Sequence, residues 1–146
     1  MDSKYKLEWT SKEKIYKEAD IISLHTPLTQ LTKNMIRKQH LLTMKPDMII
    51  INTSRGGIIN EHDLYEVMLS GHLSGAAIDV FEKEPYNGLL KEIESCLLTA
   101  HMGSMSVDCR TQMEIESTEE AVRFLMSKAL ENEVPQEEYD LQSQGL

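Results

Sequence analysis

The sequence is poor in cysteine, in long apolar runs and in positive charge. Its two cysteines, Cys96 and Cys109, are too few for a secreted disulfide framework, so we expect reduced thiols in a cytoplasmic protein. No apolar run approaches the roughly 20 residues of a membrane-spanning helix, and the charged N-terminus has no signal-peptide core. With 15 Lys and Arg against 24 Asp and Glu, the net charge of −9 disfavours nucleic acid and membranes as partners.

Glycine is scarce as well, and this absence bears directly on function. The 146 residues contain seven glycines and no G-x-G-x-x-G turn of the kind that binds a dinucleotide pyrophosphate. Only Gly56 and Gly57 are adjacent, and after Arg55 they are expected to permit a tight turn rather than to cradle phosphate. These residues therefore carry no main anchor for a dinucleotide.

The composition that remains is that of an ordinary globular domain. The sequence is 40% hydrophobic and 27% charged, and it is long enough for one domain with a substantial core. We assign residues 1–130 to this domain and residues 131–146 to an acidic tail. The tail has little to bury and no nearby Lys or Arg, so we expect it to be mobile. Its acidic residues are Glu131, Glu133, Glu137, Glu138 and Asp140.

Short apolar runs alternate with segments typical of helices, which predicts an α/β fold. Near-continuous apolar strands separated by helices indicate a parallel, Rossmann-like sheet with helices on both faces. The strands are expected over residues 19–25, 48–52, 75–80 and 95–99, with a weaker candidate over 5–9.

Capping signals place the helices between these strands. Thr10 and Glu13 fit a capping box for a helix over 11–18, and Pro46 follows a short helix over 37–44. Asn60 precedes a helix over 61–70 that ends at Gly71, and a long helix begins near Ser106. The later part of that long helix has an apolar stripe at positions 122, 125, 126, 129 and 130.

Three chemically useful side chains follow three of the predicted strands. Arg55 comes after MIIINTS, Glu84 after GAAIDVFEK and His101 after SCLLTA. Because parallel strands end at the same edge of a sheet, where ligands bind, these residues are expected to form one proton-transfer site. Taken singly, Arg55 could be in a surface ion pair, Glu84 a solvated charge and His101 a structural residue. Asp79, inside an apolar run, needs either a ligand amide or a structural partner.

In four ordered segments the chain resembles the C-terminal part of the NAD-binding domain of the D-isomer-specific 2-hydroxyacid dehydrogenases, the phosphoglycerate dehydrogenase group. The resemblance covers roughly residues 5–140 and implies a Rossmann-like sheet truncated at its N-terminal half. The segments are ADIISLHTPLT (19–29), MKPDMIIINTSRGGIINEHDL (44–64), GHLSGAAIDVFEKEP (71–85) and LLTAHMGS (97–104).

The resemblance implies a role for each matching residue. Arg55 would grip the substrate carboxylate, His101 would exchange the hydroxyl proton, and Glu84 would pair with His101. Asp79 would contact the nicotinamide end of the cofactor, which is NAD, with NADP as the alternative. The remaining cofactor contacts would be His25, Thr26 and Pro27 along the cofactor, Thr53 and Ser54 beside the nicotinamide, and Gly103, with Arg55 and His101 also touching the cofactor. Gly103 and Ser104 match the turn after His101.

Two hypotheses of different classes follow. In the first, the chain is a fragment of an NAD-dependent oxidoreductase that interconverts a D-2-hydroxy acid and a 2-keto acid, inactive without its missing half. In the second, it is a non-catalytic truncated relative that acts as an assembly or binding module. The apolar strand 20–25 would be an exposed edge. Through it the chain would recruit a complementary N-terminal half or a second copy, or its own residues 1–18 would fold over it.

Overall fold

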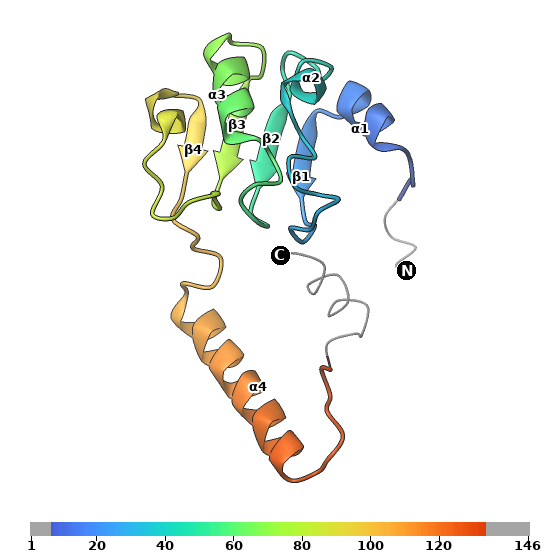
Figure 1. The fold of residues 1–146 in the computed structure, drawn as a ribbon, viewed down its shortest axis with the longest axis vertical. Helices are drawn as coiled ribbons and strands as arrows, with labels where there is room; N and C mark the ends of the chain where they lie inside the picture. Colours follow the sequence, from blue (N-terminus) through green and yellow to red (C-terminus); the bar gives the residue numbers. More distant parts are fainter. Residues whose placement is uncertain (1–6, 134–146) are drawn as a thin grey trace.

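The computed structural model describes residues 7–133, which contain four parallel strands, four α-helices and a short 3₁₀ helix (Figure 1). The strands alternate with the helices as the sequence predicts. The elements are α1 (Lys12–Glu18), β1 (Ile21–Leu24), α2 (Lys38–Leu41), β2 (Ile49–Asn52), α3 (Glu61–Leu69), β3 (Gly75–Ile78), η1 (Leu89–Glu92), β4 (Cys96–Leu98) and α4 (Val107–Leu125).

The strands form one sheet in the order β1-β2-β3-β4, with every neighbouring pair parallel. Ile22 of β1 is in register with Ile50 of β2, and Ile50 with Ala76 of β3. The parallel Rossmann-like architecture is therefore confirmed. It follows that the loops after all four strands leave from the same edge of the sheet.

Only one face of the sheet is covered among the described residues, which corrects the expectation of helices on both faces. Leu41 of α2, Leu64 of α3 and Leu90 of η1 join one core with the buried strand residues Ile22 and Ile50. On the opposite face, side chains of the same strands are open to solvent: Ile21 is 60% exposed and Leu97 66%. Both faces read as apolar in the sequence, but α2, α3 and η1 all pack on the same side.

Helix α4 lies away from the sheet (Figure 1), and none of its residues is buried. Its predicted apolar stripe is therefore exposed, with Leu125 at 81%. The helix ends at Leu125 with Met126 as its C-cap, so residues 129 and 130 lie beyond it. No helix in the described part of the chain is both long and apolar enough to span a membrane.

The capping signals are correct for two helices and displaced by one residue for a third. The Asn60 side chain accepts from the Asp63 N–H, and the Ser106 side chain caps α4. Helix α1 begins after Ser11 rather than Thr10, because the Ser11 hydroxyl accepts from the Lys14 N–H.

The predicted strand over 5–9 is wrong for residues 7–9, which form no regular element, while residues 5 and 6 lie outside the described part. Most of the predicted tail, residues 134–146, also lies outside it. At the start of the tail, Glu131 pairs with Arg123 at 2.5 Å, so this acidic residue does have a basic neighbour.

Replacing Ile50 by Ala should lower the free energy of unfolding by about 2–5 kcal/mol, the usual cost of emptying a filled core position. Ile50 is fully buried in a central strand. Denaturant unfolding of both proteins measures the difference. Leu31→Ala is the control, because Leu31 is 84% exposed and its loss should cost less than about 0.5 kcal/mol. Equal effects of the two changes would contradict the observed core.

Candidate functional site

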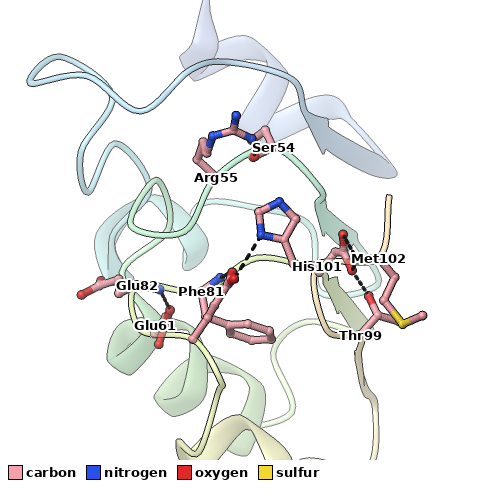
Figure 2. Close-up of polar contacts among 10 residues, drawn as sticks. Ser54, Arg55, Glu61, Phe81, Glu82, Thr99, His101 and Met102 are labelled. Atoms are coloured by element: carbon pink, nitrogen blue, oxygen red, sulfur yellow. Dashed lines mark hydrogen bonds and ion pairs between the residues drawn. The ribbon is translucent and has the colours of Figure 1, made fainter. Parts of the chain in front are cut away.

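Arg55, Glu84 and His101 meet at the edge of the sheet where the strands end. Figure 2 shows Arg55 and His101 at this edge. Arg55 leaves β2, Glu84 lies in the loop after β3, and His101 follows β4. All three line one cleft of about 480 Å³, as the sequence predicts. Glycines 56 and 57, Lys33 and Glu82 line the same cleft.

Glu84 and His101 form a hydrogen-bonded pair. The Nδ1 atom of His101 lies 3.1 Å from Oε2 of Glu84, and the other oxygen, Oε1, accepts from the Phe81 N–H at 3.1 Å. The Phe81 N–H, and after it the His101 side chain, hold the pKa of Glu84 below its ordinary value. Glu84 is therefore a partnered carboxylate that orients the imidazole, and not merely a solvated charge.

Asp79 builds the loop that carries His101. The backbone oxygen of Asp79 accepts from the His101 N–H at 2.8 Å. Asp79 as a residue is only 7% exposed, and its carboxylate accepts from the Thr99 hydroxyl and from the Met102 N–H at 2.9 Å. These contacts hold His101 at a φ of +54°, a backbone conformation uncommon for residues other than glycine.

The charge on Asp79 is stabilised by these donors. Burial by itself raises the pKa of a carboxyl group, but the Thr99 hydroxyl and the backbone N–H groups of Met102 and Gly103 outweigh it. As a result, the pKa of Asp79 lies below its ordinary value. Of the two partners that the sequence left open for Asp79, the structural one is therefore present.

Asn52, which sequence reasoning missed, builds the loop that carries Arg55. The residue is 2% exposed, and its side chain donates to the Arg55 carbonyl at 3.0 Å and accepts from the Ser54 hydroxyl at 2.9 Å. The signal available in the sequence was a polar residue at the end of the apolar run MIIIN. Asn52 thus folds the strand end back on itself and places Arg55 at the mouth of the cleft.

The guanidinium of Arg55 is not in an ion pair with any residue between 7 and 133; it donates to the Ser54 carbonyl at 2.7 Å. The alternative of a surface ion pair is therefore not met among these residues. An exposed arginine with free donors beside a carboxylate-paired imidazole can bind an anion next to a group that transfers a proton.

Gly56 brings the Arg55 loop against the Glu84 loop. A Cβ atom at position 56 would lie 2.0 Å from the carbonyl carbon of Phe81 and 2.5 Å from the Glu82 nitrogen. Only glycine fits such an approach of two backbones. Gly57 then turns the chain with a φ of +79°, so the tight turn expected at this pair is present.

The other predicted site residues lie along the same edge but outside this cleft. His25, Thr26 and Pro27 directly follow β1 and are exposed, and His25 Nε2 lies 2.8 Å from the Ser23 hydroxyl. Thr53 is exposed at the end of β2, Ser54 is half-buried, and Gly103 and Ser104 follow His101. None of these residues, nor Asp79, lines the cleft that holds Arg55.

A second cleft, of about 760 Å³, borders the first and shares Glu84 and Phe81 with it. Its other lining includes Tyr86, Leu98 and Met102, so it is the larger and more apolar of the two. The smaller cleft is the one that both Arg55 and His101 line. Within residues 7–133, no group of three His, Cys, Asp or Glu side chains is arranged to hold a metal ion.

Comparison with known proteins supplies independent information. Residues 1–103 match the family described as D-isomer specific 2-hydroxyacid dehydrogenase, NAD binding domain. A glyoxylate reductase of Thermococcus litoralis is 42% identical over 107 residues, which are 73% of this chain and 32% of that protein. The D-3-phosphoglycerate dehydrogenase of Bacillus subtilis is 37% identical over 113 residues, or 77% of this chain and 22% of that protein.

Solved structures agree with this match. The TT0316 protein from Thermus thermophilus superposes with a TM-score of 0.83 at 33% identity, over 92% of this chain and 44% of that one. The NAD-dependent formate dehydrogenase from Staphylococcus aureus, solved in complex with NAD, gives 0.76 at 28% identity over 84% and 38%. The chain therefore spans less than half the length of each relative described.

Replacing Asp79 by Asn should lower the free energy of unfolding at neutral pH by about 1–3 kcal/mol, because one amide cannot accept from all the donors that the carboxylate holds. A carboxyl whose folded pKa is depressed stabilises the fold above its unfolded pKa and loses that contribution as the pH falls through the folded value. The deficit of the variant should therefore shrink below about pH 4.

Denaturant unfolding from pH 7 to pH 2 measures this difference. Asp47→Asn, at an exposed aspartate, is the matched control and should run parallel to the wild-type protein. A constant gap between Asp79→Asn and wild type over the whole range would show that the charge on Asp79 is not what stabilises the His101 loop.

Proposed function

The chain belongs to the D-isomer specific 2-hydroxyacid dehydrogenase family, and from this premise we propose that it supplies the catalytic residues of an NAD-dependent oxidoreductase. The reaction is the interconversion of a D-2-hydroxy acid and a 2-keto acid. The observation that carries the proposal is the Glu84–His101 hydrogen bond in the cleft that Arg55 also lines.

Arg55 binds the substrate carboxylate in this proposal. Its planar guanidinium matches a carboxylate with two parallel hydrogen bonds, which fixes the orientation of the substrate as well as its position. The exposed Arg55 side chain uses one of its donors within the chain, on the Ser54 carbonyl, and keeps the others for a ligand.

His101 takes the hydroxyl proton during oxidation and returns it during reduction. Because Nδ1 faces Glu84, the other ring nitrogen, Nε2, is the atom that exchanges the proton. Glu84 holds Nδ1 and so orients the ring toward the substrate while the proton is exchanged. The imidazole is about half exposed, which leaves it open to a substrate.

The residues present fit the nicotinamide side of NAD better than its phosphates. Hydrogen-bonding side chains at His25, Thr26, Thr53 and Ser54 follow the ends of β1 and β2, next to the His101 cleft. Asp79 would hold the adjoining His101 loop. The 146 residues contain no glycine-rich phosphate turn, so the pyrophosphate would need groups from another segment. When bound, NAD supplies the hydride acceptor.

On this proposal the purified 146-residue chain should bind NAD more weakly than about 1 μM and oxidise hydroxy acids negligibly. Mixing it with the N-terminal part of a full-length relative should restore oxidation. In that mixture, His101→Gln should cut turnover about 10²–10⁴-fold, the usual contribution of general acid–base catalysis. Arg55→Gln should lower kcat/KM about 10–100-fold, because a charge-assisted pair is lost. The rise in NADH absorbance measures the rate of oxidation by the chain alone and by the wild-type, His101→Gln and Arg55→Gln mixtures.

Lys17→Gln is the control, since Lys17 lies on α1 and does not line the cleft. NAD-dependent oxidation that survives His101→Gln unchanged would overturn the proposal. Tight binding of NAD to the chain alone would show that a phosphate anchor exists within these residues. Folding and assembly without any oxidation would favour the second hypothesis, a non-catalytic binding or assembly module.

Strand β1 is the proposed point of association. It pairs only with β2 in the described sheet, and Ile21 on its open face is 60% exposed. Residues 7–18 form no strand beside it; Tyr16 of α1 instead packs into the core near the His40 ring. An unpaired apolar edge recruits another chain. That chain is a second copy in the pure protein and a complementary N-terminal half where one is supplied.

Replacing Ile21 by Lys should abolish self-association of the purified chain, because a lysine at a strand edge blocks further pairing. Sedimentation over a range of concentrations measures the mass. Leu31→Lys introduces the same charge at an exposed position away from the strand and should leave association intact. A wild-type chain that stays monomeric at high concentration would refute the proposed edge contact.

A further inference from the structure

Glu61 makes a contact that the proposed chemistry does not use. It is the first residue of α3, and its Oε1 atom accepts from the backbone N–H of Glu82 at 2.6 Å (Figure 2). The two residues are 21 positions apart, so this bond ties the start of a helix to the loop after β3. An acidic residue in the first turn of a helix ordinarily needs only solvent and the helix dipole.

The bond requires the Glu61 carboxylate to be partly desolvated, which is unfavourable for a charged group. Glu61 is half-buried, and burial raises the pKa of its carboxyl above the ordinary value even though the Glu82 N–H partly compensates. Placed on an exposed face of the same helix, the carboxylate would avoid that desolvation. We therefore expect a structural effect of this bond in the loop that contains Glu82.

That loop carries Glu84, and two consecutive N–H groups within it, those of Phe81 and Glu82, are held by carboxylates. The Phe81 N–H donates to Glu84 Oε1 at 3.1 Å, and the next one, of Glu82, donates to Glu61. Gly56 packs on the same peptide, within a distance that no side chain could share. The Phe81–Glu82 peptide is thus fixed from two sides, by Glu61 at its N–H and by the backbone next to Arg55.

We propose that Glu61 is a positioning residue, whose carboxylate fixes the Phe81–Glu82 peptide and so keeps the Phe81 N–H aimed at Glu84 and Glu84 aimed at His101. Glu61 itself does not line the cleft that holds Arg55, Glu84 and His101. It acts through the Phe81–Glu82 peptide, through Phe81 itself, whose N–H lies on the preceding peptide, and through the Glu84 carboxylate. The inference rests on the proposed function, because it assigns Glu61 a part in aligning the pair that transfers the proton.

The pKa of Glu84 reports this alignment directly. The Phe81 N–H is the largest influence that lowers it, followed by His101, while the negative charge of Asp79 raises it. If the peptide loses its anchor, the Phe81 N–H should drift away from Glu84 and the pKa should rise. Carboxyl-carbon NMR of the purified chain can follow this titration, and amide resonances of Phe81 and Glu82 can report the peptide itself.

Four variants distinguish the effect of the position of the Glu61 carboxylate from the effect of its charge and from a general loss of stability. Glu61→Ala removes the acceptor, Glu61→Asp keeps the charge but is one methylene short, and Glu61→Gln keeps the acceptor but removes the charge. Asp63→Ala is the matched control, because Asp63 lies in the same helical turn and also accepts a distant backbone N–H, that of Lys38 at 2.9 Å. That bond holds α2 rather than the site.

We expect Glu61→Ala and Glu61→Asp to raise the pKa of Glu84 by about half a unit or more and to shift the Phe81 and Glu82 amides. Glu61→Gln and Asp63→Ala should leave both near their wild-type values. If Glu61→Ala fails to fold, Glu61→Asp carries the test. An unchanged Glu84 pKa in Glu61→Asp, an equal rise in Asp63→Ala, or a rise in Glu61→Gln alone would each overturn the inference.

His101→Ala in the same series distinguishes this failure from failure of the proposed function. Loss of the imidazole should raise the pKa of Glu84, because His101 also lowers it. If His101→Ala leaves that pKa unchanged, the Glu84–His101 pair itself is refuted, whatever Glu61 does. If His101→Ala raises the pKa of Glu84 and Glu61→Asp does not, the Glu84–His101 pair is supported and only the positioning role of Glu61 is refuted.

Discussion

The approach of Gly56 to the peptide between Phe81 and Glu82 is the contact on which the geometry of the site depends. Gly56 directly follows Arg55, and the Phe81 N–H directly holds Glu84, so this single backbone contact couples the cation to the carboxylate. His101 then joins through Glu84. Any side chain at position 56 would push the loops after β2 and β3 apart, and Arg55 would no longer line one cleft with Glu84 and His101.

Buried polar side chains at the strand ends are used to build loops. Asn52 at the end of β2 bonds to both Ser54 and the Arg55 carbonyl, and Asp79 just after β3 bonds to Thr99 and Met102. A strand that leaves its sheet exchanges the regular hydrogen-bond ladder for irregular partners, and a buried polar group without a partner is costly. Both side chains meet that demand, and in doing so they fix the residues that carry chemistry.

One face of the sheet is covered by helices, and the other face is exposed to solvent. One face buries Ile22, Ile50 and Ile78 beneath α2, α3 and η1, while Ile21 and Leu97 on the other face meet solvent. Helix α4 adds Phe124 and Leu125 to the exposed apolar surface. Apolar area of this kind is stabilising only once something covers it. The same open face and edge give the proposed association its physical basis.

Local patterns in the sequence determined the elements. The apolar runs around Ile22, Ile50 and Ala76 predicted the strands, and Asn60 and Ser106 predicted helix starts, because such signals act within a few residues of chain. Order along the chain also placed Arg55, Glu84 and His101 at one edge, since parallel strands share it. Motif resemblance pointed to the family that comparison then established.

Tertiary structure decided what depends on residues far apart in the chain. Sequence alone left Asp79 between a ligand and a structural partner, overlooked Asn52 and Glu61, and predicted cover on both faces of the sheet. Partners 20 or 21 residues away, such as Thr99 for Asp79 and Glu82 for Glu61, are brought close only when the strands align. Which sheet face is covered likewise depends on where α2, α3 and η1 dock, because alternating apolar side chains make both faces of each strand suitable for burial.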